Sequence, residues 1–462
     1  MRGIVVLFVL AVIAAGVVMA WPRMEGEAPV LTGPDRIELT TDTIQIELGW
    51  DDEQTGLRRV DAYLEIGPSY EANDGAESEP TRRTEIHTKE YPGSSLSGPM
   101  RPVRSERITV DLDAKAMEIP DGESTLVLSA RDWSWADGWE GNPSELRIPI
   151  VVDTQPPNVS VKSGLTYVRR GGSAIVVYRV DADAVRSGVR VGEAWFHGQQ
   201  TMGDERIALF AIPIDAAEDP RVEVVAVDAI GNEAKAFFDV RVQEREFPEI
   251  SIALSERFLD RVARRLGDAS QMSEATPLAT FQRINTELRK LDEATIAEAI
   301  DATTTAPTQK KWSGAFEQMK NSSVTSKFAE LRHYTSQRQR VSRARHYGFD
   351  LASTAHAPIT ASNAGTVIFA EDNGIYGTLV LIDHGLGITT LYGHLSSLNV
   401  AVGDQVDKGQ ELGRSGATGL AGGDHLHFAI LVGKTYVDPV EWWDPKWVRE
   451  HIDSRLVTHS AE

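Results

Sequence analysis

The chain has 462 residues, 41% of them hydrophobic and 25% charged, and this length and composition predict two to four globular domains. Its 47 Lys and Arg against 68 Asp and Glu give a net charge of −21, which argues against a nucleic-acid partner because phosphate binding needs a cationic surface. Cysteine is absent, which excludes disulfides, thiolate nucleophiles and every cysteine-held metal site.

Residues 1–22 have the pattern of a membrane signal. Arg2 precedes an unbroken apolar run over 4–21, and at about 1.5 Å per residue this run approaches the ~30 Å hydrocarbon core of a bilayer. Residues 18–20 form a passable cleavage site, whereas Trp21 suits an interfacial anchor. We therefore expect a cell-envelope protein, which is either anchored in the inner membrane and faces the periplasm or, if the segment is cleaved, is secreted.

Two β modules are predicted next, over 28–152 and 157–243. Both stretches carry short alternating strands between turn signals, and the consecutive prolines within 153–157 indicate a stiff linker between them. In each module a strand leads through a turn with Asp and Asn to a closing strand. This weak repeat resembles bacterial immunoglobulin-like domains, so we predict two immunoglobulin-like β-sandwiches without catalytic residues. Three tryptophans lie in one turn: Trp133, Trp135 and Trp139. We interpret them as packing in a loop and the core, and a carbohydrate-stacking patch is the alternative.

A helical connector is predicted over 254–306. Apolar residues recur there at the spacing of a helix face: Phe258, Val262, Leu266, Phe281, Ile284, Leu288 and Leu291. We interpret the segment as a connector that packs on the following domain. A partner-docking element or one that occludes a cleft is the alternative.

Residues 310–445 carry short strands between glycine turns, a pattern that predicts a small antiparallel barrel or sandwich. His346 and Asp350 stand four residues apart and face the same side of an extended chain, and His425 and His427 share one face of a strand. Imidazole and carboxylate are the nitrogen and oxygen ligands of zinc, and three protein ligands leave a fourth position for the water of a catalytic site. The two motifs together predict a metal site.

Residues 312–443 resemble the M23 family of zinc metallopeptidases, the lysostaphin-like or LytM-like peptidoglycan endopeptidases. An ordered series of motifs carries the resemblance: 312–316, 324–328, 346–350, 357–359, 365–367, 382–385, 390–395, 402–406, 408–410, 413–419 and 425–427. The resemblance implies Zn²⁺ held by His346, Asp350 and His427. It also implies that His394 and His425 are the catalytic histidines, which take the proton of a metal-activated water and stabilise the oxyanion. His384 is expected to be structural or to support the site rather than to bind the metal.

Two departures from the family pattern concern loop geometry. Ala329 stands where the family usually has glycine, and the extra stretch 333–345, rich in Arg and Gln, is either a wall of the substrate cleft or a longer loop. The run 402–410 also resembles biotinyl or lipoyl carrier domains, but Lys408 lies in a turn at the start of a strand and not at a hairpin tip. We therefore disfavour a carrier.

The sequence as a whole predicts a mainly β multidomain protein with two immunoglobulin-like β-sandwiches, a helical connector and a C-terminal antiparallel β barrel-sandwich peptidase domain. Its predicted function is that of an exported zinc endopeptidase that cleaves the peptide cross-links of peptidoglycan, with stem peptides as substrate and a metal-activated water as nucleophile. The alternative is a non-catalytic M23-like regulator that activates a separate cell-wall amidase.

Overall fold

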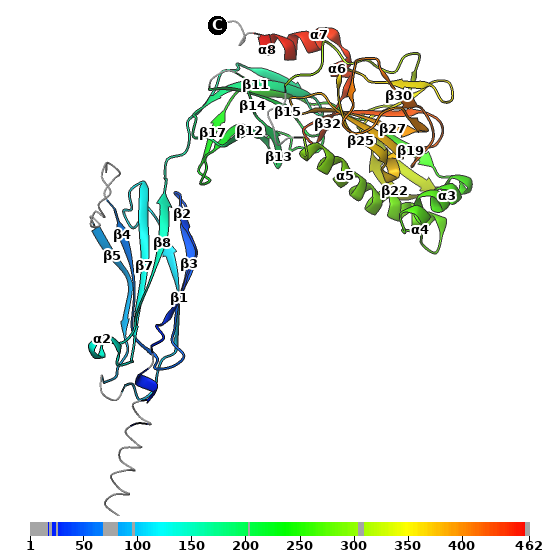
Figure 1. Ribbon diagram of the computed structural model, residues 1–462. Helices are drawn as coiled ribbons and strands as arrows, with labels where there is room; N and C mark the ends of the chain where they lie inside the picture. Colours follow the sequence, from blue (N-terminus) through cyan, green and yellow to red (C-terminus); the bar gives the residue numbers. More distant parts are fainter. Residues whose placement is uncertain are drawn as a thin grey trace, which may run out of the picture. The chain divides into compact units, whose positions relative to one another are not determined.

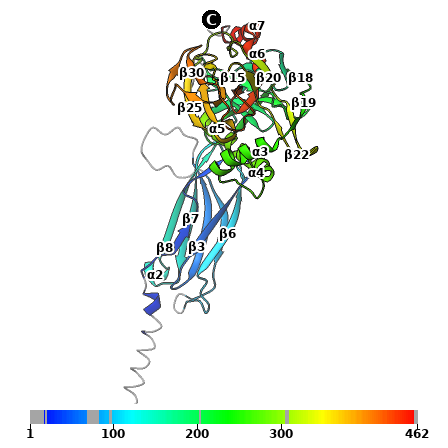
Figure 2. The same cartoon turned by 90° about the vertical axis from the view of Figure 1, so that its right-hand side faces the viewer.

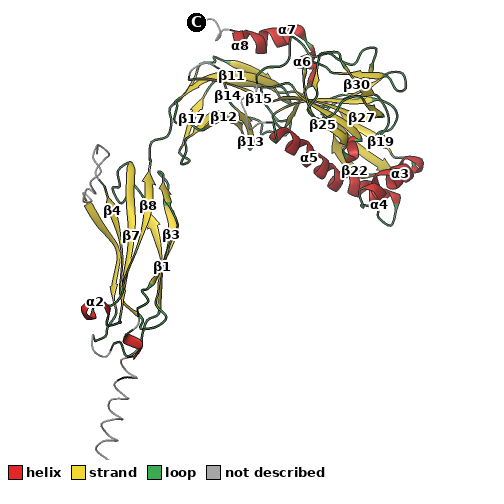
Figure 3. Cartoon of the chain, in the orientation of Figure 1, coloured by secondary structure: helices red, strands yellow, loops and turns green. Residues whose placement is uncertain are grey.

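A computed structural model of the protein describes residues 17, 21–24, 26–67, 82–94, 98–201, 204–303 and 309–457. Strands dominate these residues, as Figures 1 and 3 show, so the predicted mainly β class is confirmed. The chain divides into two compact units, Met1–Pro156 with Asp228–Asn232 and Pro157–Val227 with Glu233–Glu462.

Most of the predicted membrane signal over 1–22 lies outside the described residues, which here include Val17 and the 3₁₀ turn η1 (Trp21–Arg23). Among the helices that the structure describes, none combines the length and the apolar character that crossing a bilayer requires.

The first unit contains two antiparallel-rich sheets around one core. One sheet has the order β1-β3-β6 and the other β2-β8-β7-β4-β5. The elements are β1 (Val30–Thr32), β2 (Ile37–Leu39), β3 (Ile44–Asp51), β4 (Leu57–Ile66), β5 (Arg82–Glu90), β6 (Ser105–Leu112), β7 (Gly122–Asp132), α2 (Ala136–Trp139) and β8 (Pro143–Val152). Trp50 from β3 is fully buried between the sheets, and its indole N–H donates to the carbonyl of Ser129 at 3.1 Å, so the large side chain leaves no polar atom unpaired.

The second unit begins with further sheets of order β14-β15-β11-β9 and β13-β12-β16-β17 and with the parallel pair β10-β18. The strands are β9 (Val159–Val161), β10 (Thr166–Arg169), β11 (Ser173–Val180), β12 (Arg186–Val191), β13 (Ala194–His197), β14 (Gln199–Gln200), β15 (Glu205–Ala211), β16 (Val222–Val227), β17 (Glu233–Phe237) and β18 (Val240–Gln243). The immunoglobulin-like character of this module and of the first unit stays a prediction.

The core of this second β module continues into the C-terminal domain. Buried apolar residues of β11 and β15 belong to one hydrophobic core with those of the strands that follow residue 310. Trp442 from α6 (Pro439–Trp443) is fully buried there, and its indole N–H donates to Ser173 Oγ at 3.1 Å. The Ser173 backbone N–H donates to the carboxylate of Glu441 at 3.2 Å. Arg245 pairs with Asp438 at 2.6 Å, so polar contacts also link the two parts.

A helical segment lies between the β module and the C-terminal domain. It consists of α3 (Glu256–Val262), the π-helical turn η2 (Ala263–Gly267), α4 (Pro277–Arg283), the π-helical turn η3 (Ile284–Leu288) and α5 (Arg289–Asp301). Ser255 caps α3 by accepting from the Phe258 N–H, and Thr276 caps α4 by accepting from the Ala279 N–H. Leu259, Phe281 and other apolar residues of the segment pack on strands of the C-terminal domain. Figures 1 and 2 both show α3 and α4 beside β22.

The C-terminal domain is built on an extended antiparallel sheet with the order β20-β23-β31-β27-β26-β25-β29, to which β32 adds beside β31. Two smaller sheets, β24-β30-β28 and β19-β21-β22, accompany it. Within the described residues the end strands β20 and β29 do not pair with each other, so the sheet is open and the barrel form of the prediction is not found.

The C-terminal domain consists of short strands, as the pattern of short apolar segments between glycine turns predicted. The strands are β19 (Glu249–Ala253), β20 (Ser323–Ser326), β21 (Leu331–Ser336), β22 (Gln339–Arg345), β23 (Phe349–Ala352), β24 (Pro358–Thr360), β25 (Gly365–Asp372), β26 (Thr378–Asp383), β27 (Ile388–Leu395), β28 (Ser397–Leu398), β29 (Gln405–Val406), β30 (Glu411–Arg414), β31 (Leu426–Val432) and β32 (Thr435–Val437). The helical turns are η4 (Gly374–Tyr376), α7 (Pro445–Trp447), η5 (Val448–Asp453) and α8 (Ser454–Val457).

Candidate metal centre

Three of the predicted site residues meet at the neighbouring strands β23 and β31 of the extended sheet. Asp350 in β23 lies directly opposite His427 in β31, and His346 stands in the short connection before β23. His346 Nε2 lies 2.9 Å from Asp350 Oδ1 and 3.0 Å from His427 Nδ1, and His427 Nδ1 lies 3.0 Å from Asp350 Oδ1. All three side chains are buried, so the register of the strands brings two imidazoles and one carboxylate to a single point.

The hydrogen bonding of His346 suits a metal ligand. Its Nδ1–H donates to the carbonyl of Lys327 at 2.9 Å, which leaves the Nε2 lone pair facing the carboxylate of Asp350 and the ring of His427. Two ring nitrogens and a carboxylate oxygen at such short separations, away from water, are stable only with a cation or protons among them. A buried set of two imidazoles and one carboxylate fits zinc, with one coordination position left for water.

Both carboxylate oxygens of Asp350 have partners. Oδ2 accepts a hydrogen bond from Arg332 Nη2 at 2.7 Å, so Oδ1 is directed at the two imidazoles. Burial by itself raises the pKa of Asp350, but the charge of His346 and the hydrogen bonds from the histidines outweigh it and hold the pKa well below its usual range. The carboxyl group is therefore ionised and able to bind a cation.

His394 and His425 lie beside this group, with their rings 4.8 Å apart. His394 Nδ1–H donates to the carbonyl of Thr418 at 2.9 Å, and His425 Nδ1–H donates to the carbonyl of Gly423 at 2.8 Å. Both rings therefore keep Nε2 free of a backbone partner, and His425 Nε2 lies 3.5 Å from Asp350 Oδ1. The backbone of His394 has a φ of +66°, a strained conformation for a residue with a Cβ that is frequent at functional sites.

The environments of these two histidines differ. Burial and the neighbouring His425 and His427 lower the pKa of His394 well below its usual value. Burial also acts to lower the pKa of His425, but its contact with Asp350 outweighs burial and raises it. The His394 ring is therefore held neutral, whereas the His425 ring is more readily protonated.

Further described histidines of the C-terminal domain do not belong to the group of His346, Asp350 and His427. His384 is fully buried against Phe316, its Nδ1–H donates to the carbonyl of Ala364 at 2.7 Å, and burial lowers its pKa to about 4. The side chain of His356 is 69% exposed. His451 is also exposed, and its ring stacks on Trp447. His459 lies outside the described residues.

Ala329, which stands where the family pattern has glycine, adopts a backbone conformation that favours glycine. Its φ is +63°, in the left-handed region, and its side chain is fully buried. The Ala329 N–H donates to the carbonyl of His346 at 2.7 Å, so this turn fixes the backbone of a candidate ligand.

A cavity of about 100 Å³ is lined by the metal group, the name used here for His346, Asp350 and His427. Its wall also includes residues that no motif predicted. From outside the motifs come Arg289, Tyr334, Arg345 and Tyr376. The extra stretch 333–345 forms most of the hairpin β21–β22, which packs against the helical segment at this wall. Tyr376 donates to Glu293 at 2.6 Å, and Glu293 also accepts from Tyr436 at 2.7 Å. Motif spacing gives no signal for these residues because their segments meet only in the tertiary fold.

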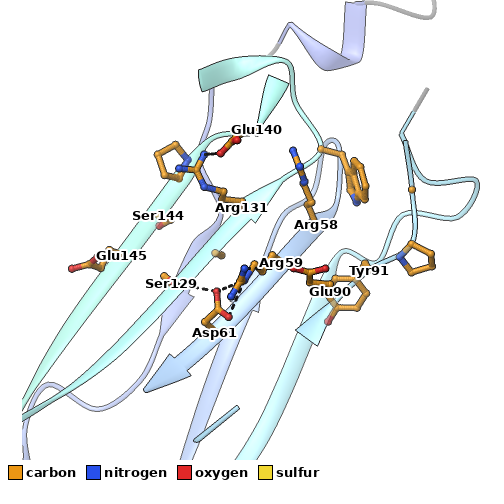
Figure 4. Close-up of a pocket in the computed structure, with 15 residues that line it drawn as sticks. Arg58, Arg59, Asp61, Glu90, Tyr91, Ser129, Arg131, Glu140, Ser144 and Glu145 are labelled. Atoms are coloured by element: carbon orange, nitrogen blue, oxygen red, sulfur yellow. Dashed lines mark hydrogen bonds and ion pairs between the residues drawn. The ribbon is translucent and has the colours of Figure 1, made fainter. Parts of the chain in front are cut away.

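A larger hollow on the first unit has a different character (Figure 4). It measures about 840 Å³, and its charged groups pair with one another, as Arg59 does with Asp61 at 2.8 Å. Trp133 is only 6% exposed and has the Arg58 guanidinium 5.3 Å from its ring centre. Trp133 therefore packs in the fold and is not part of an exposed aromatic patch, and the hollow contains no group of metal-ligating side chains among the described residues.

Comparison with known proteins finds similarity in the C-terminal domain. Residues 344–439 match the model of peptidase family M23. The DD-carboxypeptidase/endopeptidase Mpg of Neisseria meningitidis serogroup B is 39% identical over 95 residues, which are 21% of this chain and 22% of that protein. The peptidoglycan DD-endopeptidase ShyA of Vibrio cholerae is 38% identical over 89 residues, which are 19% of this chain and 21% of that protein. The chain thus spans about a fifth of the length of the curated relatives that it matches.

Among solved structures, the catalytic domain of the antimicrobial peptidase lysostaphin from Staphylococcus simulans is 34% identical to this chain. That match covers 21% of this chain and 79% of the lysostaphin domain, with a TM-score of 0.21.

Proposed function

Because the chain carries an M23 peptidase domain, we propose that the protein is an exported zinc endopeptidase that cleaves peptide cross-links of peptidoglycan. One observation carries the proposal. His346, Asp350 and His427 converge to within 3.0 Å of one another, with His394 and His425 beside them.

In this proposal His346 Nε2, Asp350 Oδ1 and His427 Nδ1 hold the zinc ion. When bound, zinc acts as a Lewis acid that lowers the pKa of a water nucleophile and polarises the scissile carbonyl. Arg332 keeps Asp350 oriented through Oδ2, and the carbonyl of Lys327 keeps His346 in the tautomer that exposes Nε2.

The two remaining histidines take the catalytic roles. Thr418 and Gly423 fix the rings of His394 and His425 through Nδ1, so that neither Nε2 has a backbone partner and each can accept or donate a proton at the reacting peptide. A ring that donates stabilises the oxyanion of the tetrahedral intermediate, and a ring that accepts takes the proton of the nucleophile. Their preset tautomers reduce the reorganisation that the reaction requires.

The proposed substrate and location rest on the relatives and on the sequence. A curated relative named as a peptidoglycan DD-endopeptidase supports stem peptides as the substrate class. The apolar run over residues 4–21 after Arg2 supports export to the cell envelope, as an anchored or a cleaved chain.

The decisive experiment measures bound metal and peptide release together. The full chain, purified without a histidine tag, is expected to contain close to one zinc ion and to release peptides from intact peptidoglycan, as seen by mass spectrometry. His427→Ala is expected to lose both properties, whereas His356→Ala, which changes an exposed histidine, keeps both. A chain that binds no zinc and releases nothing refutes the proposal and favours the alternative, a regulator that activates a separate amidase.

A further inference from the structure

Two arginines that line the metal cavity have no carboxylate partner among the described residues. Arg289 begins α5, and Arg345 ends β22. No carboxylate oxygen of the described residues lies within 4.0 Å of either guanidinium, whereas the third arginine of the cavity, Arg332, pairs with Asp350 at 2.7 Å. The wall beside the metal group therefore carries positive charge that the protein does not neutralise by ion pairing.

The guanidinium of Arg289 is held in place by a neighbouring amide. Its Nη2 donates to Asn285 Oδ1 at 2.9 Å. Asn285 is buried, and its own Nδ2 donates to Ser342 Oγ at 2.8 Å and to the carbonyl of Arg343 at 3.2 Å, which ties it to β22. The Nε atom of Arg289 is buried without a hydrogen-bond acceptor. A charged donor in that state is costly and indicates that an acceptor from outside the chain completes it.

The acidic residue one turn after Arg289 on the same helix is already engaged. Glu293 lies one helical turn after Arg289, but its two carboxylate oxygens accept from the hydroxyls of Tyr376 and Tyr436. These two bonds direct the carboxylate at the tyrosines, and no ion pair with Arg289 forms within 4.0 Å.

Arg345, at the end of β22, is held in place by a hydrogen bond as well. Its Nη1 donates to the carbonyl of Ala329 at 2.9 Å, which leaves the other donors of the fork for a ligand. Two fixed guanidinium groups in one small cavity with the metal group form a site that matches a planar anion.

We infer that Arg289, assisted by Arg345, binds a free carboxylate of the substrate next to the scissile bond. The inference rests on the proposed peptidase function and names the substrate class of that site. Such an enzyme prefers a cross-link whose residue beside the cleaved bond carries a carboxylate over a bridge of glycines. Arg289 lies outside the matched residues 344–439, whereas Arg345 lies within them, so the helical segment supplies the main recognition residue and the M23 domain supplies the assisting one.

The test uses the full chain and two fluorescent stem-peptide cross-links that differ only in a carboxylate or a carboxamide on the residue beside the scissile bond. Cleavage gives kcat/KM, and fluorescence anisotropy gives the Kd of each peptide. The native chain is expected to favour the carboxylate peptide about 10- to 100-fold in both measurements, the range for hydrogen bonds to a charged group. Arg289→Gln is expected to reduce the preference to less than about threefold while zinc content is unchanged, because Arg289 is not a metal ligand.

Two further variants separate recognition from folding. Arg289→Lys keeps the charge without the planar fork and is expected to retain part of the preference. Arg283→Gln serves as the matched control, because Arg283 lies on the same helical segment but pairs with Glu287 at 2.9 Å and Glu274 at 3.0 Å outside the cavity. Thermal unfolding of each variant checks that it is folded.

The possible results distinguish this inference from the proposed function. Equal binding of the two peptides by the native chain, or an unchanged preference in a folded Arg289→Gln variant, overturns the inference even if both peptides are cleaved. Preferential binding of the carboxylate peptide without cleavage of either supports the inference and refutes the peptidase function.

Discussion

Asp292 makes the stability of the second unit depend on pH. It lies in α5, it is 5% exposed, and its Oδ2 accepts from the backbone N–H of Ile375 at 2.7 Å. This bond holds the turn η4, which carries Tyr376 to the metal cavity. Burial raises the pKa of Asp292 from 3.8 to about 7. The fold therefore favours the protonated carboxyl group.

The sign and size of the effect follow from this difference in pKa. A carboxyl group whose pKa is raised on folding stabilises the fold fully below about pH 3.8, and this stability is lost as the pH rises through 7. With these two values, the free energy of unfolding falls by about 3 kcal/mol between pH 4.5 and pH 8 on account of this one group.

Asp292→Asn removes the ionisation and keeps an oxygen that accepts from Ile375. Urea unfolding of the native chain and the variant at pH 4.5 and pH 8 gives the difference in pH dependence, in which the contributions of other groups cancel. We expect the variant to lose about 3 kcal/mol less than the native chain over this range. Asp301→Asn, which changes a half-exposed acid paired with Lys434, serves as the control and leaves the pH dependence within about 0.5 kcal/mol of native. Equal pH dependence in Asp292→Asn and the native chain would refute the reasoning.

Three further substitutions test the hairpin, the shared core and the proposed catalytic role of His394. Arg338→Gly is expected to stabilise the protein by about 0.5–1 kcal/mol in thermal unfolding, because Gln337 and Arg338 in the β21–β22 turn both have positive φ, of 48° and 65°. Trp442→Ala should destabilise it by about 3–5 kcal/mol in urea, since it empties a fully buried site and removes the hydrogen bond to Ser173. His394→Ala should keep its zinc, measured by mass spectrometry, while peptide release slows by about 10²- to 10⁴-fold.

Each of these has a matched control. Arg340→Gly, within β22, should destabilise the protein, and a similar loss in Arg338→Gly would contradict the turn argument. Trp139→Ala, which removes a side chain that is 47% exposed, should change the stability by less than about 0.5 kcal/mol. Loss of zinc from His394→Ala would assign that residue to the metal and not to proton transfer, and His356→Ala should behave as the native chain.

Local sequence patterns were sufficient for the parts of the site that depend on short-range geometry. Period-two alternation places His425 and His427 on one face of a strand, and the HxxxD spacing brings His346 and Asp350 together. The pairing of Asp350 opposite His427 depends on strand register, which alternation alone does not determine, and only the ordered family motifs pointed to it. The backbone of Ala329 shows the same limit, because the sequence revealed the missing glycine but not that alanine would adopt its positive φ.

The wall of the cavity was beyond sequence reasoning for a different reason. Arg289 and Glu293 lie on a helix whose apolar spacing predicted packing, but no local pattern specifies which strand that helix packs on. Tyr376 is brought to the metal group by a turn that Asp292 holds from that helix. Such long-range contacts arise from packing in the folded chain. The open sheet in place of a barrel is likewise a property of strand pairing and not of strand content.

The continuous core through Trp442 has a practical consequence for the production of the C-terminal domain or its fusion to another protein. A fragment that starts at residue 310 would lose Ser173, the partner of both the Trp442 indole and the Glu441 carboxylate, and would expose apolar surface to water. The C-terminal domain is therefore not expected to fold as an isolated fragment. Expression plasmids, chimaeras and gene fusions should begin near Pro157, so that the β module and the candidate metal site stay in one compact unit.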